Sequence, residues 1–226
     1  MKKWIFISIE VILYSIFLWI DIFVPDQADL SSKIKYVSIL LCFLYVLFFL
    51  GKEEEKQDVT LLRLSFLFTL ISDTFLLLMG NYAVGMTTFL VAQLLHRCRL
   101  RSERPQRIQW LICVGLLLLG VLRIIGIPLD YVLVVATFYF LCILSNAGYS
   151  LLHCENRVYT IGLVLFLCCD INVGLFNLAS YVQVPEGLCF IVEHIVSVLM
   201  WFFYLPSQVL IALSAKKRST CSKDYK

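Results

Sequence analysis

The chain has 226 residues, of which 61% are hydrophobic and only 15% are charged. Soluble domains are closer to half apolar, and no stretch between the apolar runs is long enough to form a separate soluble domain. The composition therefore excludes an ordinary water-soluble protein. It indicates an all-α, polytopic membrane helix bundle built from one domain, residues 1–226. The formal net charge of +3 identifies no partner by itself, because the positions of the charges matter more than their sum.

Eight apolar segments are predicted to cross the membrane, with ends defined to about 2–4 residues. They are residues 4–24, 35–50, 59–79, 82–100, 108–126, 129–152, 157–178 and 186–213. The second segment is shorter than the roughly 20 residues that usually span a bilayer. Two pairs of segments are separated only by the turn sequences GNYAVG (80–85) and GIPLD (126–130), which predict tight hairpins.

The distribution of Lys and Arg predicts that both ends of the chain are cytoplasmic. Fifteen of the nineteen basic residues fall in the predicted inner regions, whereas only Lys33 and Lys35 fall in outer loops. This asymmetry follows the positive-inside rule, so the basic segment 97–107 and the basic tail are attributed to topology and the lipid bilayer, and no nucleic-acid partner is expected. A short chain without a recognisable sorting signal suits a multi-pass protein of a bacterial cytoplasmic membrane. The nine cysteines include no C-x-x-C pair and are interpreted as small apolar residues.

Three carboxyl groups are predicted to lie at one depth in the membrane. Helix rise places Asp73 about 21 Å along the third segment and Asp170 about 20 Å along the seventh. Glu193 enters from the outer side and reaches the same level of a core about 30 Å thick. Charges are costly at this depth, so Asp73 and Asp170 are interpreted as functional, whereas Glu10 and Asp21 are expected near the interface.

Polar residues recur on one face of several predicted helices. The stripes comprise Glu193, Ser197, Trp201, Tyr204 and Gln208; Tyr139, Asn146, Ser150 and His153; Phe89, Gln93 and His96; and Asp170, Gly174 and Asn177. Residues three or four apart share a helix face, so the stripes are expected to face one another around a polar centre, with apolar residues outward. Hydrogen bonding between helices remains an alternative role for Ser197, Asn146 and Ser150.

Several catalytic motifs are missing from the sequence. There is no H-x-x-x-H or H-E-x-x-H metal motif, no G-x-S-x-G elbow and no phosphate-binding glycine pattern. Metal-dependent hydrolysis is therefore not expected, and no cofactor is predicted. The remaining chemistry is acid–base work by paired carboxyl groups in a site shielded from water.

Three stretches of the sequence resemble the YhhN/TMEM86 family, whose characterised members are lysoplasmalogenases. The first, LSFLFTLISDTFLLLMGNYAVGMTTFLVAQLLH (64–96), has an aspartate, a Gly-x-x-x-Phe run and a polar residue four past the Phe. The others are IGLVLFLCCDINVGLFNL (161–178), with the second aspartate, and FFYLPSQVLIALS (202–214), with a Tyr-x-x-x-Gln pattern. Together with the spacing and the number of spans, the resemblance covers nearly the whole chain.

The resemblance implies hydrolysis of the vinyl ether bond of alkenyl lysophospholipids, giving a fatty aldehyde and a glycerophospho-base. The reaction needs an acid that is protonated near neutral pH and a partner that steadies a cation, which suits a buried pair of carboxyl groups titrating as a unit. Asp73 and Asp170 are predicted as this catalytic pair, without a metal or organic cofactor. The predicted substrate-binding residues are Gln93, His96, Asn146, Glu193, Tyr204 and Gln208.

The sequence also departs from the family pattern. Gln93 stands where the family usually has His, His96 where it has Tyr, and Cys169 where Ser is common. The change at Gln93 keeps open a catalytically silent, lipid-binding relative as a second hypothesis. A small proton-coupled transporter is a third, since carboxyl groups near the membrane midplane serve that function too.

Overall fold

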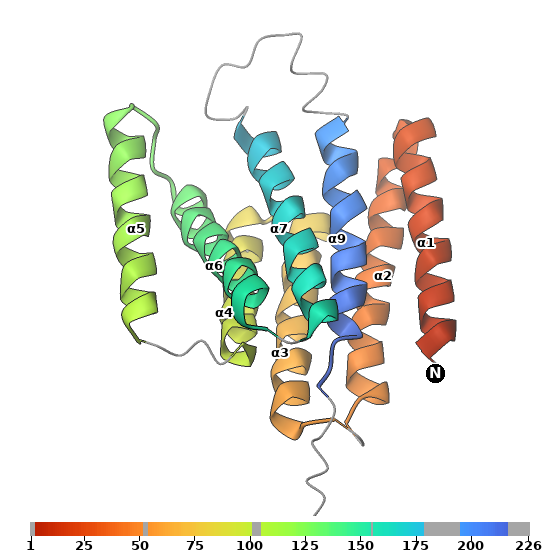
Figure 1. Ribbon diagram of the computed structural model, residues 1–226. Helices are drawn as coiled ribbons and strands as arrows, with labels where there is room; N and C mark the ends of the chain where they lie inside the picture. The colour runs from red at the N-terminus through yellow and green to blue at the C-terminus, as the bar shows by residue number, and fades with distance from the viewer. Residues whose placement is uncertain (1–2, 52–53, 101–104, 155, 179–194, 217–226) are drawn as a thin grey trace, which may run out of the picture.

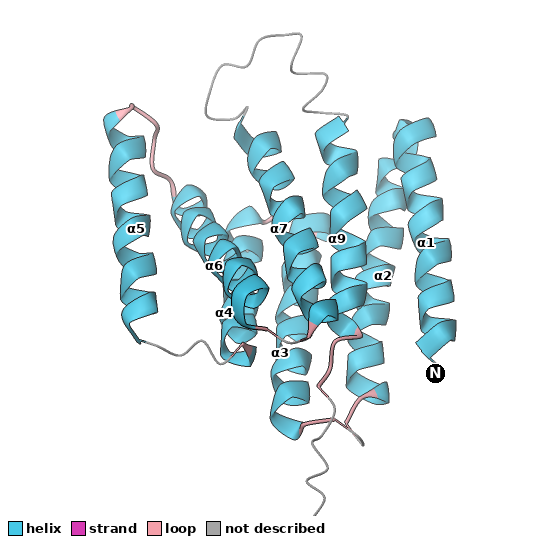
Figure 2. Ribbon diagram, viewed as in Figure 1, coloured by secondary structure: helices cyan, strands magenta, loops and turns pink. Residues whose placement is uncertain are grey.

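The computed structural model describes residues 3–51, 54–100, 105–154, 156–178 and 195–216. In this part of the chain the elements are helices joined by short loops (Figure 2). The predicted class, an all-α bundle of apolar helices, is confirmed.

The long helices follow the predicted segments closely. Their bounds are α1 Lys3–Phe23, α2 Ala28–Phe49, α3 Lys56–Asp73, α4 Tyr82–Arg99, α5 Pro105–Ile124, α6 Tyr131–His153, α7 Arg157–Leu178 and α9 Ser197–Ala212. A 3-10 turn, η1 (Pro25–Gln27), precedes α2, and a π-helical segment, η2 (Thr74–Leu78), continues α3. The main difference is α2, which begins at Ala28 rather than residue 35. Of the eighth predicted segment, residues 186–194 lie outside the described residues.

Successive helices run in alternating directions, so α1 begins at the same end of the bundle at which α9 ends (Figure 1). This is the predicted cytoplasmic end. Helix α7 packs along α9, and α3 packs along α4, while α5 lies at one edge against α6. Helices α1 and α2 form the other edge and contact α9.

Five helices of the described residues are long and apolar enough to cross a membrane. They are Lys3–Phe23, Pro25–Phe49, Lys56–Leu78, Tyr131–His153 and Arg157–Asn177; the apolar helices Ile108–Ile124 and Ser197–Ala212 are shorter. Helix α4 has a more polar composition because Gln93, His96 and Arg99 point into the bundle, where all three are buried. Large apolar side chains such as Trp4, Leu117 and Ile161 are exposed on the outside, as expected for a surface that faces lipid.

Two helices approach closely because a glycine lies between them. A Cβ atom added at Gly162 of α7 would lie 3.3 Å from the backbone oxygen of Ser207 and 2.8 Å from the Ile211 side chain, both in α9. Membrane helices associate through such small residues, because lipid-shielded helices gain no hydrophobic driving force from packing. This contact fixes α9 against α7, about two helical turns before Asp170 along α7.

Polar backbone groups between the helices are satisfied by side chains of neighbouring helices. Arg63 of α3 donates hydrogen bonds to the carbonyl oxygens of Val46, Leu47 and Leu50, at distances of 2.7–3.3 Å. These carbonyls belong to the last turn of α2, which has no further helical N–H groups to bind them. Arg63 therefore caps the C-terminus of α2, a role that was not predicted from the sequence.

Helix α9 contains Pro206, and the backbone bond that this proline removes is replaced from α1. Proline has no N–H, so the carbonyl of Phe202, four residues earlier, lacks its helical donor. The Tyr14 hydroxyl of α1 donates to this Phe202 oxygen at 2.9 Å. The helix therefore stays continuous through Pro206, and the first helix of the chain is joined to the last one described.

We expect Tyr14→Phe to lower the free energy of unfolding by about 1 kcal/mol, because it leaves the Phe202 carbonyl without a donor. In a Pro206→Ala background, the restored N–H would bind that carbonyl, and the same Tyr14→Phe change should cost much less. Unfolding of the four variants in detergent, followed by circular dichroism, measures this coupling. Equal costs in both backgrounds would show that the Tyr14 contact does not replace the missing backbone bond.

Candidate functional site

Asp73 is the last residue of α3 and directly precedes the π-helical turn η2. Its side chain is buried, and its Oδ2 accepts a hydrogen bond from the Tyr204 hydroxyl of α9 at 2.8 Å. The neighbouring Ser72 hydroxyl donates to the Gly85 carbonyl of α4 at 2.6 Å, and Thr74 donates to the Tyr36 hydroxyl of α2 at 3.1 Å. Single π-helical turns occur often at functional sites. Here one follows a carboxyl group that contacts three other helices directly or through its neighbours.

Asp170 lies in the second half of α7 and has a matching environment. It is buried, and its Oδ2 accepts a hydrogen bond from the Tyr139 hydroxyl of α6 at 2.7 Å. Tyr139 itself is 4% exposed, so this phenol has no access to bulk water. Each of the two predicted catalytic carboxyl groups is thus held by one tyrosine from a different helix.

Phe89 joins the two acid–tyrosine pairs in one aromatic cluster. Its ring centroid lies 5.8 Å from that of Tyr139 and 6.2 Å from that of Tyr204. Phe166 of α7 completes the cluster, 6.1 Å from Phe89 and 5.5 Å from Tyr204. We call Asp73, Asp170 and these four rings the acid–tyrosine cluster.

No hydrogen bond joins Asp73 and Asp170 directly in the described part of the chain. Each carboxyl group makes a separate hydrogen bond to a phenol, and their action as one catalytic pair stays a prediction.

Gln93 and Asn146 form a second polar pair between α4 and α6, one helical turn from Phe89 along α4. The Asn146 amide donates to the Gln93 backbone oxygen at 2.9 Å and to Gln93 Oε1 at 3.2 Å. Both residues are buried, yet Gln93 Nε2 and Asn146 Oδ1 have no hydrogen-bond partner. A buried donor and a buried acceptor left open together suit a water molecule or a hydroxyl group, which can fill both roles.

The other predicted binding residues do not all lie in the same part of the structure. Gln208 is buried one turn beyond Tyr204 on α9, and its Nε2 donates a long hydrogen bond of 3.5 Å to the Ser207 hydroxyl. Glu193 lies outside the described residues. His96 is buried, but its Nδ1 lies 3.1 Å from the Tyr159 hydroxyl, one turn further toward the predicted cytoplasmic end than Gln93. The structure therefore does not bring His96 into the acid–tyrosine cluster.

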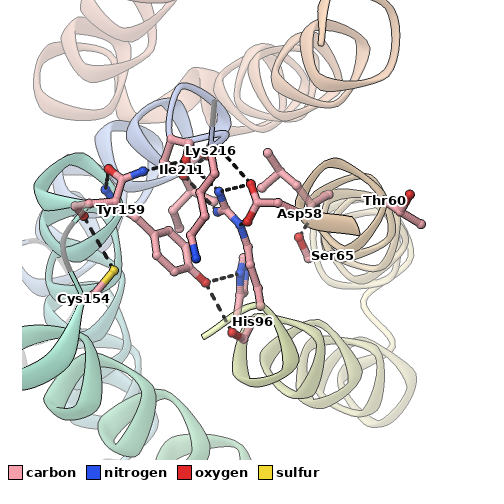
Figure 3. Close-up of polar contacts among 12 residues, drawn as sticks. Asp58, Thr60, Ser65, His96, Cys154, Tyr159, Ile211 and Lys216 are labelled. Atoms are coloured by element: carbon pink, nitrogen blue, oxygen red, sulfur yellow. Dashed lines mark hydrogen bonds and ion pairs between the residues drawn. The ribbon is translucent and has the colours of Figure 1, made fainter. Parts of the chain in front are cut away.

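His96 belongs instead to a polar network that joins four segments at the predicted cytoplasmic end (Figure 3). Arg99 of α4 binds both carboxylate oxygens of Asp58 at 2.8 and 3.0 Å, and its guanidinium also donates to the Ser214 backbone oxygen at 2.7 Å. The Lys216 backbone N–H donates to Asp58 Oδ2 at 2.9 Å. Arg99 also stacks 4.2 Å from the centre of the Tyr159 ring, whose hydroxyl faces His96. We call this group the cytoplasmic network.

Sequence reasoning missed three members of the acid–tyrosine cluster, namely Tyr139, Phe89 and Phe166, and Phe166 lies in none of the predicted stripes. Tyr139 was recognised as part of a polar stripe on α6 but not as the partner of Asp170, and Phe89 was not recognised as the common contact of both tyrosines. The available signal was their position: Phe89 lies four residues before Gln93, and Tyr139 seven before Asn146, so each shares a helix face with a predicted binding residue.

Two other carboxyl groups have partners that the sequence did not predict. Glu10 was expected at the interface but is buried against α2, where its Oε1 accepts from the Cys42 thiol at 3.4 Å. Asp21 pairs with Lys35 at 2.8 Å. Within the described residues, no group of three or more His, Cys, Asp or Glu side chains is placed to hold a metal ion.

Comparison with known proteins gave one match, to a protein family. Neither a curated protein nor a solved structure matches the chain. The YhhN family matches residues 30–215, a range that contains both carboxyl groups, all four rings of the acid–tyrosine cluster and the Gln93–Asn146 pair. Since this range is most of the sequence, the chain belongs to the YhhN family.

Proposed function

We propose that the protein is a lysoplasmalogenase-like hydrolase, which cleaves the vinyl ether bond of alkenyl lysophospholipids. One observation supports this proposal above the others: two carboxyl groups, from α3 and α7, are buried in one aromatic cluster, each with a single phenol as its hydrogen-bond donor. An ionised carboxyl group is costly inside a membrane bundle, so a pair of them is kept there for function. Membership of the YhhN family is consistent with this activity.

The reaction that suits this site begins with transfer of a proton to carbon. The carboxylic acid of Asp73 or Asp170 gives its proton to the alkenyl carbon remote from the ether oxygen, and the C=C electron pair forms the new C–H bond. The resulting oxocarbenium ion is stabilised by the other, ionised carboxyl group. The aromatic rings exclude bulk water and offer an apolar surface to the alkenyl chain.

Water then completes the hydrolysis. A water molecule adds to the oxocarbenium carbon and returns a proton to a carboxylate, which gives a hemiacetal. The C–O bond of the hemiacetal breaks, the glycerol oxygen takes up a proton, and a fatty aldehyde and a glycerophospho-base are released. The unpaired Gln93 Nε2 and Asn146 Oδ1 are suited to hold the attacking water or a glycerol hydroxyl. The tyrosine hydroxyls keep each carboxyl group in one orientation.

A catalytically silent, lipid-binding protein is the second candidate, because Gln93 stands where the resemblance to the family leads us to expect His. An amide cannot exchange a proton as an imidazole does. This candidate predicts binding of alkenyl lysophospholipid without release of aldehyde. The proposed hydrolase predicts both.

We expect Asp73→Asn and Asp170→Asn each to lower aldehyde release from an alkenyl lysophosphoethanolamine by about 100-fold or more, since each removes one of the two acid–base groups. Asp26→Asn, which changes an exposed carboxyl group of η1, is the matched control and should retain full activity. Aldehyde release is measured with purified protein in detergent. Undiminished activity in either cluster variant would exclude the two-carboxyl mechanism.

We expect Tyr139→Phe and Tyr204→Phe to lower the same activity by roughly 10-fold each, because the carboxyl groups keep their chemistry but lose their fixed orientation. Tyr131→Phe is the control: its phenol is exposed and contacts only the Thr87 hydroxyl at 2.9 Å among the hydrogen bonds found. If the two cluster variants were as active as the control, the tyrosines would serve packing alone.

A further inference from the structure

A hollow of about 650 Å³ opens between α1, α2 and α9 at the end of the bundle opposite the cytoplasmic network. Its polar lining includes Asp21, Ser32, Lys35, Ser197 and the Trp201 indole, and the rest of its wall is mostly apolar. The volume is within the range of small-molecule pockets, about 300–1,000 Å³. The hollow is therefore large enough for a ligand with both polar and apolar parts.

The polar wall of the hollow carries both signs of charge. Lys35 Nζ lies 2.8 Å from Asp21 Oδ2, and the side chains are only 10% and 13% exposed. The ammonium group also lies 5.0 Å from the centre of the Trp201 ring and 5.7 Å from that of Phe17. A lysine ammonium has three N–H donors, so Lys35 can bind Asp21 and still accept a second anionic partner.

The hollow lies near the ends of the helices that line it, where the head-group layer of a bilayer is expected. Lys35 is seven residues from the start of α2, about 10 Å along the helix, and Asp21 is two residues from the end of α1. Trp201 lies one turn into α9, and tryptophan is enriched at this level of membrane proteins. Lys33, on the same helix, differs from Lys35: it is exposed and pairs with Asp29 on the surface.

The hollow adjoins the acid–tyrosine cluster through two rings. The Trp201 indole, which lines the hollow, lies 5.1 Å from the Tyr204 ring in an edge-to-face contact, and the Tyr204 hydroxyl binds Asp73. Trp201 and Tyr204 are three residues apart on α9, which is about 4.5 Å along the helix axis. The glycerol unit between the phosphate and the ether bond of a lysophospholipid has to cover a short span of this kind.

We propose that the hollow binds the zwitterionic phospho-base head group of a one-chain phospholipid. The phosphate binds the Lys35 ammonium group, and the positively charged base binds the Asp21 carboxylate. This inference rests on the proposed function, since it assigns a head-group site to the same substrate. A bound head group would explain why the Lys35–Asp21 pair and the Trp201 indole line an open hollow beside the acid–tyrosine cluster and are not covered by other side chains.

The test uses an alkyl-ether lysophosphoethanolamine, a probe with a saturated chain that cannot be hydrolysed as a vinyl ether, and measures its equilibrium binding to the full-length protein in detergent. Binding is thereby separated from activity. We expect Lys35→Met to weaken binding by about 10-fold or more, because it removes the phosphate partner and keeps the apolar stem. The matched control Lys33→Met, on the exposed side of α2, should bind as the wild type does.

A double variant, Asp21→Asn with Lys35→Met, removes both charges, so no buried charge is left unpaired if the single variant folds poorly. It should also bind the probe about 10-fold or more weakly, yet bind a monoacylglycerol of equal chain length as the wild type does. Glycerophosphoethanolamine, the head group without the chain, should compete with the probe in the wild type alone.

Two results would overturn the proposal. One is unchanged binding of the probe by both the single and the double variant. The other is an equal loss of probe and monoacylglycerol binding, which would assign Lys35 a role in folding only. Probe binding that depends on Lys35 in a protein that releases no aldehyde would support the head-group site while contradicting the proposed hydrolase activity.

Discussion

A polar group buried between membrane helices has no bulk water to bind, so its partner has to come from the protein, from its own helix or from a neighbouring one. This constraint accounts for several contacts between the helices of the bundle. Arg63 of α3 binds the open carbonyls at the end of α2, and Tyr14 of α1 binds the carbonyl that Pro206 leaves open in α9. The carboxyl groups of Asp73 and Asp170 obey the same rule through Tyr204 and Tyr139. The polar contacts therefore position the helices as much as the apolar packing does.

Places where this rule is not met carry information about function. Gln93 Nε2 and Asn146 Oδ1 are buried and unpaired although each residue makes other hydrogen bonds. An unpaired buried polar atom costs roughly 1–3 kcal/mol, so its presence one helical turn from Phe89 of the acid–tyrosine cluster fits a position that a reactant occupies. The Lys35–Asp21 pair differs, since it is satisfied internally and yet borders an open hollow.

The sequence was sufficient to predict the class of fold, the order and direction of the helices, and the inward position of both aspartates. The length of an apolar segment and the Lys and Arg residues that flank it can be determined for each segment separately, so these two signals do not depend on how the helices pack. The partners of the aspartates could not be predicted, because they depend on which faces of α3, α6, α7 and α9 meet. A stripe such as Tyr139 and Asn146 shows which residues share a face, but not that Tyr139 is opposite Asp170 while Asn146 is opposite Gln93. The partner of His96 could not be predicted for the same reason: its helix face was predicted, but its contact with the Tyr159 hydroxyl was not, and its role in substrate binding stays a prediction.

The cytoplasmic network has a consequence for how the protein is made. Asp58 and Arg99 are brought together early in the chain, yet the atoms that complete their hydrogen bonds belong to Ser214 and Lys216, near its end. The Tyr14 hydroxyl of α1 likewise binds a carbonyl, that of Phe202, which is made much later in synthesis. During synthesis the first four helices enter the membrane well before these partners leave the ribosome, so the bundle can reach its final packing only after residues 202–216 have been made. A nascent chain that lacks the last turns of α9 can form the Arg99–Asp58 pair, but its other Arg99 N–H groups still lack the Ser214 acceptors.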